Sequence, residues 1–470
     1  MTLLSPRLSD TRDDDIDDLA KVAIVGRGFT GIMTAIALFK GIERPFHLVM
    51  FDPRPRIDIG EAVSQFSSTV LTSRVRDLSV EPGIPDDFRE WLETDEGHHS
   101  QPVSDGMSLD DSFVPGEKFR PYVYDRFSEG LARRPDVVVQ FLSESVTSID
   151  RHPQGGLSVV FGARQQKQFD AVFLATGYGI RDPSNEAAAR SVGRNVIIIG
   201  GGIQAVDKAL TLLKEGKVSH VDLISESGFL PQSHTRVAVG SLFTDQPIPR
   251  TLRGAFRFLR QAAMRADADG LGWQGIMNGF RSHARELWEG LAPEERRRFK
   301  RHVQAIYESH RNRLPPEHYR TLHDAIESGA ITVRKGRVER IATNGVLLST
   351  SVGLEVLPGD STIDCRFRPS GIDSPLIGSL FSSGLAESDE LGVGVIVDGC
   401  GQTRNAKTNC RGLFAMGSLG LGSIPDIDLV PQIVLQSHAA ASLLDSWLGK
   451  QDRKTSQTQI RSSVECRQVG

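Results

Sequence analysis

The stretch "IVGRGFTGIMTAIALF" (Ile24–Phe39) places three glycines, Gly26, Gly28 and Gly31, between a short apolar segment and a helix-forming segment. The β-branched residues before Gly26 are typical of a buried parallel strand. In the order strand, turn, helix, the first glycine permits a tight turn and the second lets the backbone approach a pyrophosphate. The third lets the helix pack on the strand. The stretch therefore predicts a dinucleotide-binding unit.

A carboxylate follows where such a unit needs one. The next predicted strand, residues 47–52, ends at Asp52, 21 residues after Gly31. An acid at this distance can accept hydrogen bonds from ribose hydroxyls. The helix N-terminus would present free N–H groups and the positive end of its dipole to the phosphates. The residues expected to contact this first dinucleotide are Gly26, Gly28, Phe29, Thr30, Gly31 and Asp52.

The same pattern occurs a second time. The stretch "NVIIIGGGIQAVDKALTLL" (residues 195–213) has the form strand, G-x-G-x-x-A, helix, and the strand after it ends beside Glu226. In both units the first glycine lies 26 residues before the acid. Two units in phase predict two dinucleotides, and a flavin with a nicotinamide is the economical pair because one delivers hydride and the other holds it. The residues expected to contact the second dinucleotide are Gly200, Gly202, Ile203, Gln204, Ala205 and Glu226.

A third segment, "FDAVFLATGYG" (residues 169–179), is an apolar strand that ends in Ala-Thr-Gly-Tyr. With it the chain resembles the two-dinucleotide-binding flavoproteins, in which the N-terminal glycine motif holds FAD and an A-T-G segment closes the first lobe. An inserted Rossmann unit then holds NADH or NADPH. The A-T-G-Y form is common in flavin monooxygenases that hydroxylate nitrogen or sulfur. The resemblance implies that Thr176 and Gly177 contact the flavin nucleotide.

Further blocks resemble a bacterial FAD/NAD(P)-binding oxidoreductase family. Their order along the chain carries this resemblance, which covers most of residues 20–445. It implies that Gly417 and Ser418 contact FAD and that the last predicted helix, with Pro431 at its start, points its N-terminus at the flavin. The blocks are residues 76–92, 113–127, 228–234, 310–316 and 412–422.

Three positions depart from the pattern of these relatives. Residues 71–75 read Leu-Thr-Ser-Arg-Val where the family often has L-N-V-P, which affects the expected contacts with the flavin ring. Gly417 is followed by Ser418 where many relatives have an aspartate that grips the ribityl chain. Glu226 stands where related sequences often carry an arginine for the phosphate of NADP. A carboxylate would repel that phosphate, which favours NADH.

The composition limits the kinds of partner that the protein is expected to bind. The chain has 470 residues, 39% hydrophobic and 24% charged, with a formal net charge of −4. This predicts a globular protein of two or three domains that binds a small molecule and is not drawn to nucleic acid or to a membrane. No apolar run approaches the roughly 20 residues that span a bilayer. The first residues lack the basic and apolar regions of a signal peptide, so we expect a cytoplasmic protein.

The cysteines exclude several kinds of site. Cys365, Cys400, Cys410 and Cys466 are widely spaced without a C-x-x-C, which predicts reduced thiols rather than disulfides or zinc ligands. A flavin enzyme that passes electrons to a cysteine pair usually has that pair close in sequence. We find no ligand-spaced metal cluster and no hydrolytic triad.

The predicted fold class is α/β, with two Rossmann-like dinucleotide-binding domains, an FAD domain carrying an inserted NAD(P) domain, and a helical insertion. The FAD domain is expected in two parts, residues 20–193 and 346–449. The NAD(P) domain is expected over residues 194–345, with the helical insertion at about 250–329. Residues 1–19 and 450–470 are expected to be flexible.

The insertion is rich in arginine. Between Arg250 and Arg320 there are 15 Arg or Lys against 8 Asp or Glu, including "EERRRFKRH" at residues 294–302. A solvated helix face is the ordinary explanation, since the whole chain is acidic. A nucleic-acid surface and the attraction of an acidic substrate are the alternatives. His234 and His310 lie in family-like blocks and are candidate proton donors, although a structural role is the commoner fate of a histidine.

The leading hypothesis for the reaction is that NADH or NADPH reduces FAD and that the protein is a monooxygenase using molecular oxygen. Its substrate would be a small molecule such as an amine or amino acid. The linker before the second unit lacks the F-x-G-x-x-x-H pattern typical of many S- and N-oxygenating relatives. The alternatives are an NAD(P)H oxidase or reductase that makes no oxygenated product, and a non-catalytic flavin sensor that binds a partner through its arginine-rich insertion.

Overall fold

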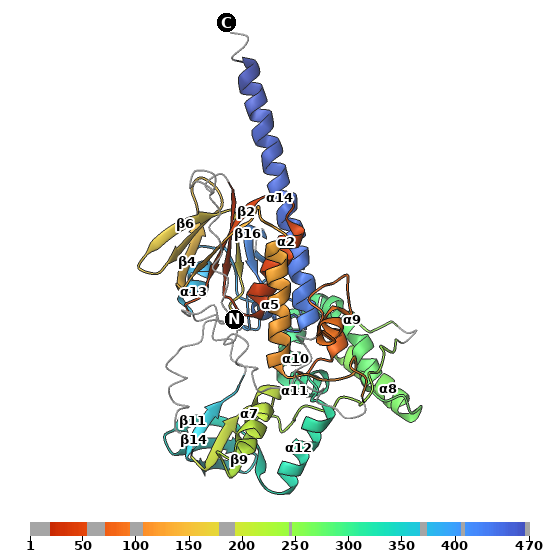
Figure 1. Ribbon diagram of the computed structural model, residues 1–470. Helices are drawn as coiled ribbons and strands as arrows, with labels where there is room; N and C mark the ends of the chain where they lie inside the picture. The colour runs from red at the N-terminus through yellow and green to blue at the C-terminus, as the bar shows by residue number, and fades with distance from the viewer. Residues whose placement is uncertain are drawn as a thin grey trace.

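Figure 1 shows the chain as a computed structural model. The structure describes residues 19–53, 71–94, 107–177, 193–243, 247–366, 374–405 and 409–465, and for residues 450–465 it describes the backbone alone. Tyr178 and Cys466 lie outside the described residues. Two largely parallel sheets organise the chain, and each belongs to one of the two predicted units. The predicted α/β class is confirmed.

The first sheet has the order β15-β16-β7-β1-β2-β3, and every neighbouring pair except β15–β16 is parallel. Its central strands are continuous apolar runs because both faces are covered. Helices cover one face, and the antiparallel sheet β4-β5-β6 with α13 covers the other. The strands are β1 (Ala20–Val25), β2 (Phe46–Phe51), β3 (Val138–Leu142), β7 (Ala171–Leu174), β15 (Gln402–Arg404) and β16 (Asn409–Ala415). The covering elements are α2 (Phe29–Gly41), α5 (Gly116–Ala132), α14 (Val430–Glu465), β4 (Val146–Arg151), β5 (Leu157–Phe161), β6 (Gln165–Phe169) and α13 (Pro375–Ser382).

The second sheet repeats this plan with four parallel strands in the order β10-β9-β8-β14. Two helices pack on one face, and a three-stranded antiparallel sheet packs on the other. The strands are β8 (Asn195–Ile199), β9 (His220–Ser225), β10 (Ile331–Lys335) and β14 (Ser361–Asp364). The covering elements are α7 (Ile203–Lys214), α12 (Pro316–Glu327), β11 (Arg337–Ala342), β12 (Gly345–Thr350) and β13 (Gly353–Pro358).

Strand β14 differs from the sequence prediction, which returns the chain to the FAD domain at residue 346. β14 pairs in parallel with β8, from Ser361 opposite Val196 to Asp364 opposite Ile199. The pairing satisfies backbone N–H and C=O groups on the second edge of β8, and β14 is the strand that follows the β11–β13 sheet in sequence. We therefore propose that the second domain extends to Asp364.

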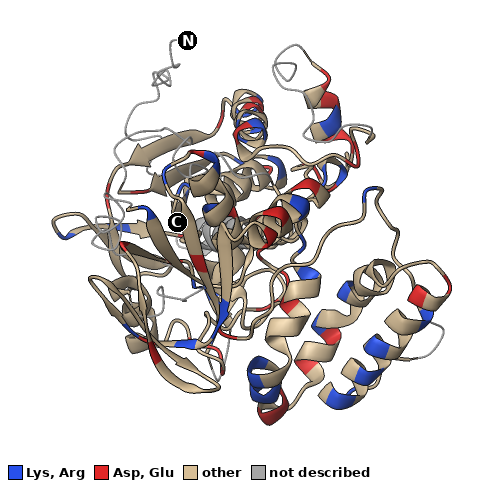
Figure 2. Cartoon of the chain, turned by 90° about the horizontal axis from the view of Figure 1, so that it is seen from below, with Lys and Arg blue, Asp and Glu red and all other residues tan. Residues whose placement is uncertain are grey.

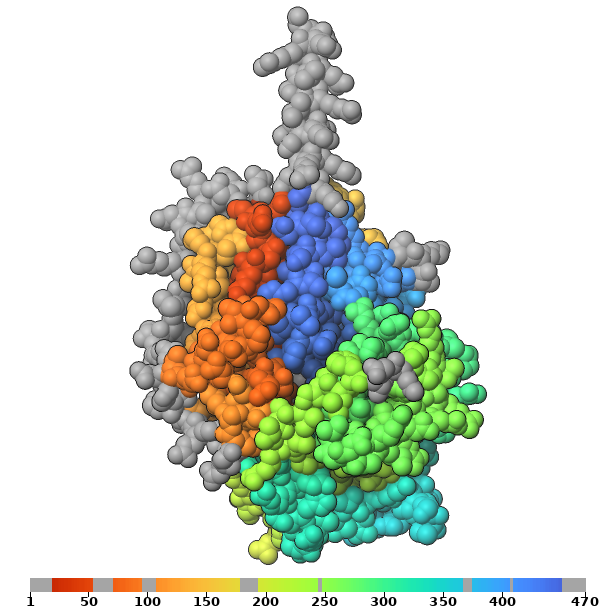
Figure 3. All heavy atoms as spheres, turned by 90° about the vertical axis from the view of Figure 1, so that its right-hand side faces the viewer, coloured from red at the N-terminus to blue at the C-terminus, as the bar shows by residue number. Residues whose placement is uncertain are grey.

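Four helices, α8 (Leu252–Ala268), α9 (Gln274–Gly290), α10 (Pro293–His302) and α11 (Gln304–Arg311), lie between β9 and α12 in sequence. α8 and α9 share a small apolar core built around Leu259, Met277 and Phe280, and Tyr307 of α11 packs against it. Thr251 begins α8 by accepting a hydrogen bond from the N–H of Gly254. Figure 3 shows these green and teal elements against the orange and blue surface of the first domain.

The C-terminal helix is longer than predicted. The sequence predicts a flexible tail after Lys450, whereas α14 continues to Glu465 and projects from the body of the molecule (Figure 1). Residues 451–465 contain neither glycine nor proline, so nothing in the sequence stops the helix. Among the described residues, no helix is both long and apolar enough to cross a membrane. The shorter elements are η2 (Val75–Asp77), α4 (Asp87–Leu92) and η4 (Gly417–Gly420).

Candidate functional site

The first glycine turn joins β1 to α2, and its glycines are required by close contacts. Gly26 has a φ of +104°, and a Cβ there would collide with the carbonyl of Ala175. A Cβ on Gly31 would collide with the carbonyl of Gly26. At Gly28, the N-cap of α2, a Cβ would meet nothing within 4 Å. The turn is therefore closed toward the sheet and open beside the start of the helix.

The open side suits an anion. No side chain caps α2, and its first turn contains no acidic residue, so its leading N–H groups face the space beside Gly28. Asp52 is buried after β2 and accepts a hydrogen bond from the N–H of Arg27 at 3.0 Å. Phe29 lies at the other side of the turn, 5.6 Å from Phe119 between ring centroids. The turn thus holds Asp52 close to the N-terminus of α2.

Three parallel strands end together beside this turn. β1 leads into Gly26, β7 into Thr176 and β16 into Gly417, because neighbouring parallel strands end at one edge of a sheet. Gly177 and Gly417 have φ values of +64° and +62°. A Cβ on Gly417 would lie 2.9 Å from Oγ1 of Thr30. Ser418 is also buried here.

Two polar atoms at this edge have no partner among the described residues. Thr176 Oγ1 is buried without a hydrogen bond, and so is Nε2 of Gln436 on α14. Gln436 Oε1 accepts a hydrogen bond from the N–H of Gly417 at 2.8 Å. Sequence reasoning missed Gln436, whose only signal is its place in the first turns of the last helix. The glycine turn, the buried carboxylate of Asp52 and the two unpaired polar atoms together fit an FAD nucleotide.

The second glycine turn has the same construction between β8 and α7. Gly200 has a φ of +136°, with its Cβ position 3.3 Å from Ala205 Cβ and 3.1 Å from the carbonyl of Cys365. Gly202 is the N-cap of α7, and a Cβ there would meet nothing within 4 Å. α7 has neither a side-chain cap nor an acid in its first turn, which begins with Ile203 and Gln204. This turn fits the pyrophosphate of a second dinucleotide.

Glu226 is exposed just after β9, as the motif requires. It lies near two arginines that sequence reasoning missed. The hydrogen bond to Glu339 raises the pKa of Arg337, and the charge of Glu226 adds to this effect. The hydrogen bond to Asp364 likewise raises the pKa of Arg366, with Glu226 again contributing. Glu226 therefore lies near two guanidinium groups that are already paired with Glu339 and Asp364.

His234 and His310 are held by other contacts. His234 Nε2 lies 3.0 Å from the carbonyl of Thr72, and burial lowers the pKa of His234 to about 3. It is therefore neutral at pH 7 and donates its Nε2–H to Thr72. His310 Nδ1 lies 2.8 Å from the carbonyl of Ile306, and its ring lies 4.9 Å from that of Trp273. Both rings are thus held by contacts within the protein, and their role as proton donors stays a prediction.

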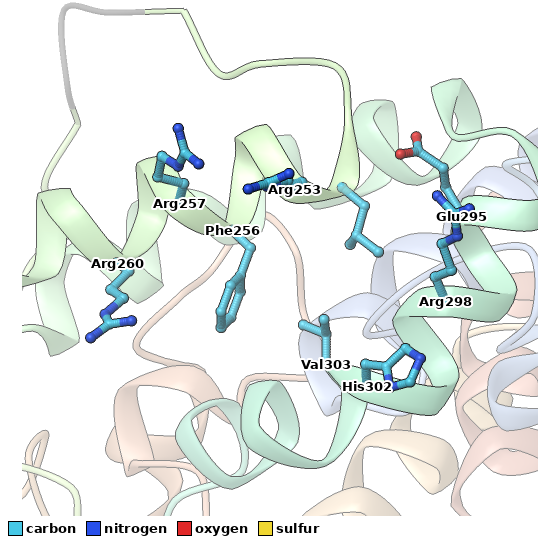
Figure 4. Close-up of a pocket in the computed structure, with 9 residues that line it drawn as sticks. Arg253, Phe256, Arg257, Arg260, Glu295, Arg298, His302 and Val303 are labelled. Carbon is cyan, nitrogen blue, oxygen red and sulfur yellow. The ribbon is translucent and has the colours of Figure 1, made fainter.

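The arginine-rich insertion forms an open pocket of about 380 Å³ between α8 and α10 (Figure 4). Figure 2 marks the positions of Lys and Arg in blue and those of Asp and Glu in red along the chain. Phe256 and Val303 give the pocket an apolar part. Arg253, Arg257, Arg260 and Arg298 are exposed at its edge. Solvated guanidinium groups are the ordinary state of such a helix face.

The described residues contain no group of His, Cys, Asp and Glu that could hold a metal ion. The three cysteines among them, Cys365, Cys400 and Cys410, form no disulfide. Cys365 and Cys400 are half-buried and Cys410 is buried. Burial raises the pKa of Cys400 and Cys410, which disfavours a reactive thiolate.

Comparison with known proteins agrees with this site. Residues 23–179 match the model of the FAD-NAD(P)-binding family, so this part of the chain is an FAD-NAD(P)-binding domain of that family. A comparison with curated proteins gives no match. The match covers the first glycine turn, Asp52 and Thr176. FAD and a nicotinamide coenzyme are therefore the cofactors of this fold.

Solved structures extend the likeness to the whole chain. L-lysine 6-monooxygenase from Pseudomonas syringae has a TM-score of 0.59 at 15% identity, over 91% of this chain and 99% of the other. Ornithine hydroxylase from Pseudomonas aeruginosa, in its reduced form, has a TM-score of 0.57 at 16% identity, over 92% and 100%. A bacillithiol disulfide reductase from Staphylococcus aureus has a TM-score of 0.51 at 12% identity, over 92% and 98%. The chain thus has the fold of FAD/NAD(P)H-dependent oxidoreductases.

Proposed function

We propose that this protein is a flavin-dependent monooxygenase in which NADH or NADPH reduces FAD and molecular oxygen then oxygenates a small amine or amino acid. The observation that carries the proposal is the pair of uncapped glycine turns, one in each domain, without two neighbouring cysteines among the described residues. When both nucleotides are bound, the nicotinamide supplies hydride and the flavin passes electrons on to oxygen.

The residues at the first sheet edge would hold the flavin nucleotide. The N–H groups at the start of α2 would bind its pyrophosphate, and Asp52 would bind its ribose. The unpaired hydroxyl of Thr176 and the amide Nε2 of Gln436 would gain the hydrogen bonds that they lack. The turn at Gly200 and Gly202 would bind the nicotinamide coenzyme in the same way, with Glu226 near its ribose.

Lysine and ornithine are substrates worth testing, because the two monooxygenases of similar fold carry those names. The disulfide reductase of similar fold makes the reductase alternative worth testing as well. Free cysteines with raised pKa values argue against a dithiol route in this chain.

The first experiment records the visible spectrum of the purified protein and mixes it anaerobically with NADH or NADPH. Air is then admitted with L-lysine or L-ornithine, and oxygen, hydrogen peroxide and hydroxylated amine are measured. A yellow protein that bleaches and then forms product with little peroxide supports the proposal. Peroxide equal to the coenzyme oxidised, whatever amine is present, indicates an oxidase. Failure of both coenzymes to bleach the flavin indicates a sensor.

A matched pair of variants tests whether the second glycine turn binds the nicotinamide coenzyme. Gly202→Trp should keep flavin but lose most reduction by coenzyme, because the indole occupies the space beside the N-terminus of α7. Gly240→Trp is the control, since Gly240 is an exposed loop glycine of the same domain with equal space around it.

A further inference from the structure

We propose that Arg313 forms a buried subsite for the carboxylate of the substrate, so that the substrate is an organic acid such as an amino acid. The inference rests on the proposed function and deepens it. Arg313 follows α11 and lies where the two domains and the helical insertion meet. Ligand sites commonly form at such junctions.

Residues 232–234 and 309–314 pair through backbone hydrogen bonds and form the surroundings of Arg313. The N–H of Gln232 donates to the carbonyl of Ser309 and the N–H of Leu314 donates to the carbonyl of Gln232, both at 2.8 Å. The N–H of His234 donates to the carbonyl of Leu314, also at 2.8 Å. Because His234 in turn contacts the carbonyl of Thr72, the pairing fixes Arg313 beside the first domain.

Arg313 is buried with an uncompensated charge. It is 3% exposed, and its one hydrogen bond to a described residue runs from Nη2 to Oδ1 of Asn278, a neutral amide. Its Nε has no partner among the described residues. Its guanidinium lies 5.6 Å from the centroid of the Trp273 ring. A buried guanidinium without an anion is costly, so a ligand that supplies one is favoured.

The neighbouring charges do not neutralise Arg313. Burial, followed by repulsion from Arg281 and Arg74, lowers the pKa of Arg313 to about 10, and it remains a cation at pH 7. His234 is neutral because of its lowered pKa. The charged groups that act on Arg313 are thus positive, and the neighbouring His234 is neutral.

The acids of the junction already have cationic partners. Asp426 contacts Arg311 closely and lies 4.0 Å from Arg281, and Asp428 lies 3.7 Å from Arg311. Arg281 and Arg311 therefore match these two carboxylates, and no described acid adds to the charges that act on Arg313. The single positive charge of Arg313 is left without an acid among the described residues, and it matches a monoanion.

The acidic residues of the first domain at this junction also have arginine partners. Asp111 lies 3.0 Å from Arg76 and 3.8 Å from Arg74. Asp77 lies close enough to both arginines to feel their charge, although burial raises its pKa. A carboxylate fits the remaining positive charge better than a phosphate, which carries more negative charge. The planar fork of a guanidinium binds a carboxylate through two parallel hydrogen bonds.

The test uses the flavin-loaded full chain and needs neither coenzyme nor oxygen. Acetate and its neutral analogue acetamide are titrated at constant ionic strength while tryptophan fluorescence and the thermal midpoint are followed. Acetate should change the Trp273 signal and raise the midpoint, whereas acetamide should do neither. Trp273→Phe should remove the fluorescence change and thereby assign it. An equal response to both compounds, or no response to acetate, overturns the proposal in the unmodified protein.

Variants and a second anion complete the test. Arg313→Gln should weaken the response to acetate by at least about tenfold, and Arg313→Lys by less, because a lysine keeps the charge but not the fork. Unaltered acetate binding by Arg313→Gln overturns the proposal. A response to inorganic pyrophosphate that NADH competes away, with none to acetate, also overturns it, because the site then belongs to the coenzyme. Failure of the monooxygenase assay leaves these binding results unchanged, so the two hypotheses fail separately.

Discussion

Gly28 is a single position where a side chain would fill the space that a pyrophosphate needs. A Cβ there meets nothing within 4 Å, so the fold tolerates a larger residue while the nucleotide does not. Gly28→Trp should therefore retain less than about one tenth of the wild-type flavin per chain. Absorbance of the purified protein measures this. Gly83→Trp, at an exposed glycine with equal space, is the control and should stay yellow. A yellow Gly28→Trp protein would contradict the assignment of the first turn.

Glu226 is the residue that should decide between the two coenzymes. Glu226→Arg removes the carboxylate that repels a 2′-phosphate and adds a guanidinium near Arg337 and Arg366, whose own charges are paired with Glu339 and Asp364. The ratio of kcat/KM for NADPH to that for NADH should rise by about tenfold, which corresponds to about 1.4 kcal/mol. Glu215→Arg, an acid at the far end of α7, should leave the ratio as it is. An unchanged ratio in Glu226→Arg would refute this role.

The helical insertion is fastened to the first domain by the buried pair Arg311–Asp426, which joins α11 to the loop after η4. Arg311→Met leaves a buried carboxylate with only the more distant Arg281, and should lower the free energy of unfolding by about 3 kcal/mol in a denaturant titration. Adding Asp426→Asn should recover part of the loss. Asn removes the charge and tolerates the φ of +64° at this position.

The matched control lies on α10. Arg297 pairs with Glu294 at 3.6 Å, and both side chains are more than half exposed. Arg297→Met should change the free energy of unfolding by less than about 0.5 kcal/mol, because an exposed pair is weak. An effect of Arg311→Met as small as this would show that the insertion does not depend on the pair.

Elements differ in how far the sequence predicts them. The glycine turns are predictable because strand, turn and helix are contiguous, and the open space at Gly28 and Gly202 follows from local geometry. The pairing of β14 with β8 joins residues 165 positions apart, for which no local pattern exists. The charges that act on Arg313 come from Arg74 and Arg281, so their meeting depends on how the first domain packs against the helical insertion.

The whole molecule should lose stability in mild acid through its domain junction. Burial holds the pKa of His234 at about 3, below the ordinary value of about 6.5, so the native state stays neutral where the unfolded chain binds a proton. The contribution of neutral His234 to the free energy of unfolding is fully present above pH 6.5 and is lost as the pH falls toward 3. Between pH 7 and pH 5 the wild type should lose at most about 2 kcal/mol more than His234→Gln.

Chemical denaturation at the two pH values measures this difference. His318 and His438, whose pKa values burial also lowers, remain in both proteins and cancel in the comparison. The exposed His283→Gln should behave as the wild type does. Equal acid sensitivity of wild type and His234→Gln would mean that the junction does not exclude the proton.

The junction also governs how the domains can move. Arg74 donates to the carbonyls of Thr235 at 2.6 Å and Arg236 at 3.2 Å, and Asp111 accepts from the N–H of Ala238 at 3.0 Å. These bonds tie two stretches of the first domain to one loop of the second. A hinge rotation would have to break them together, since each restrains the same loop. Separation of the domains should accordingly be an all-or-none event. A ligand that can dissociate only after the domains separate would then leave at the rate of that separation.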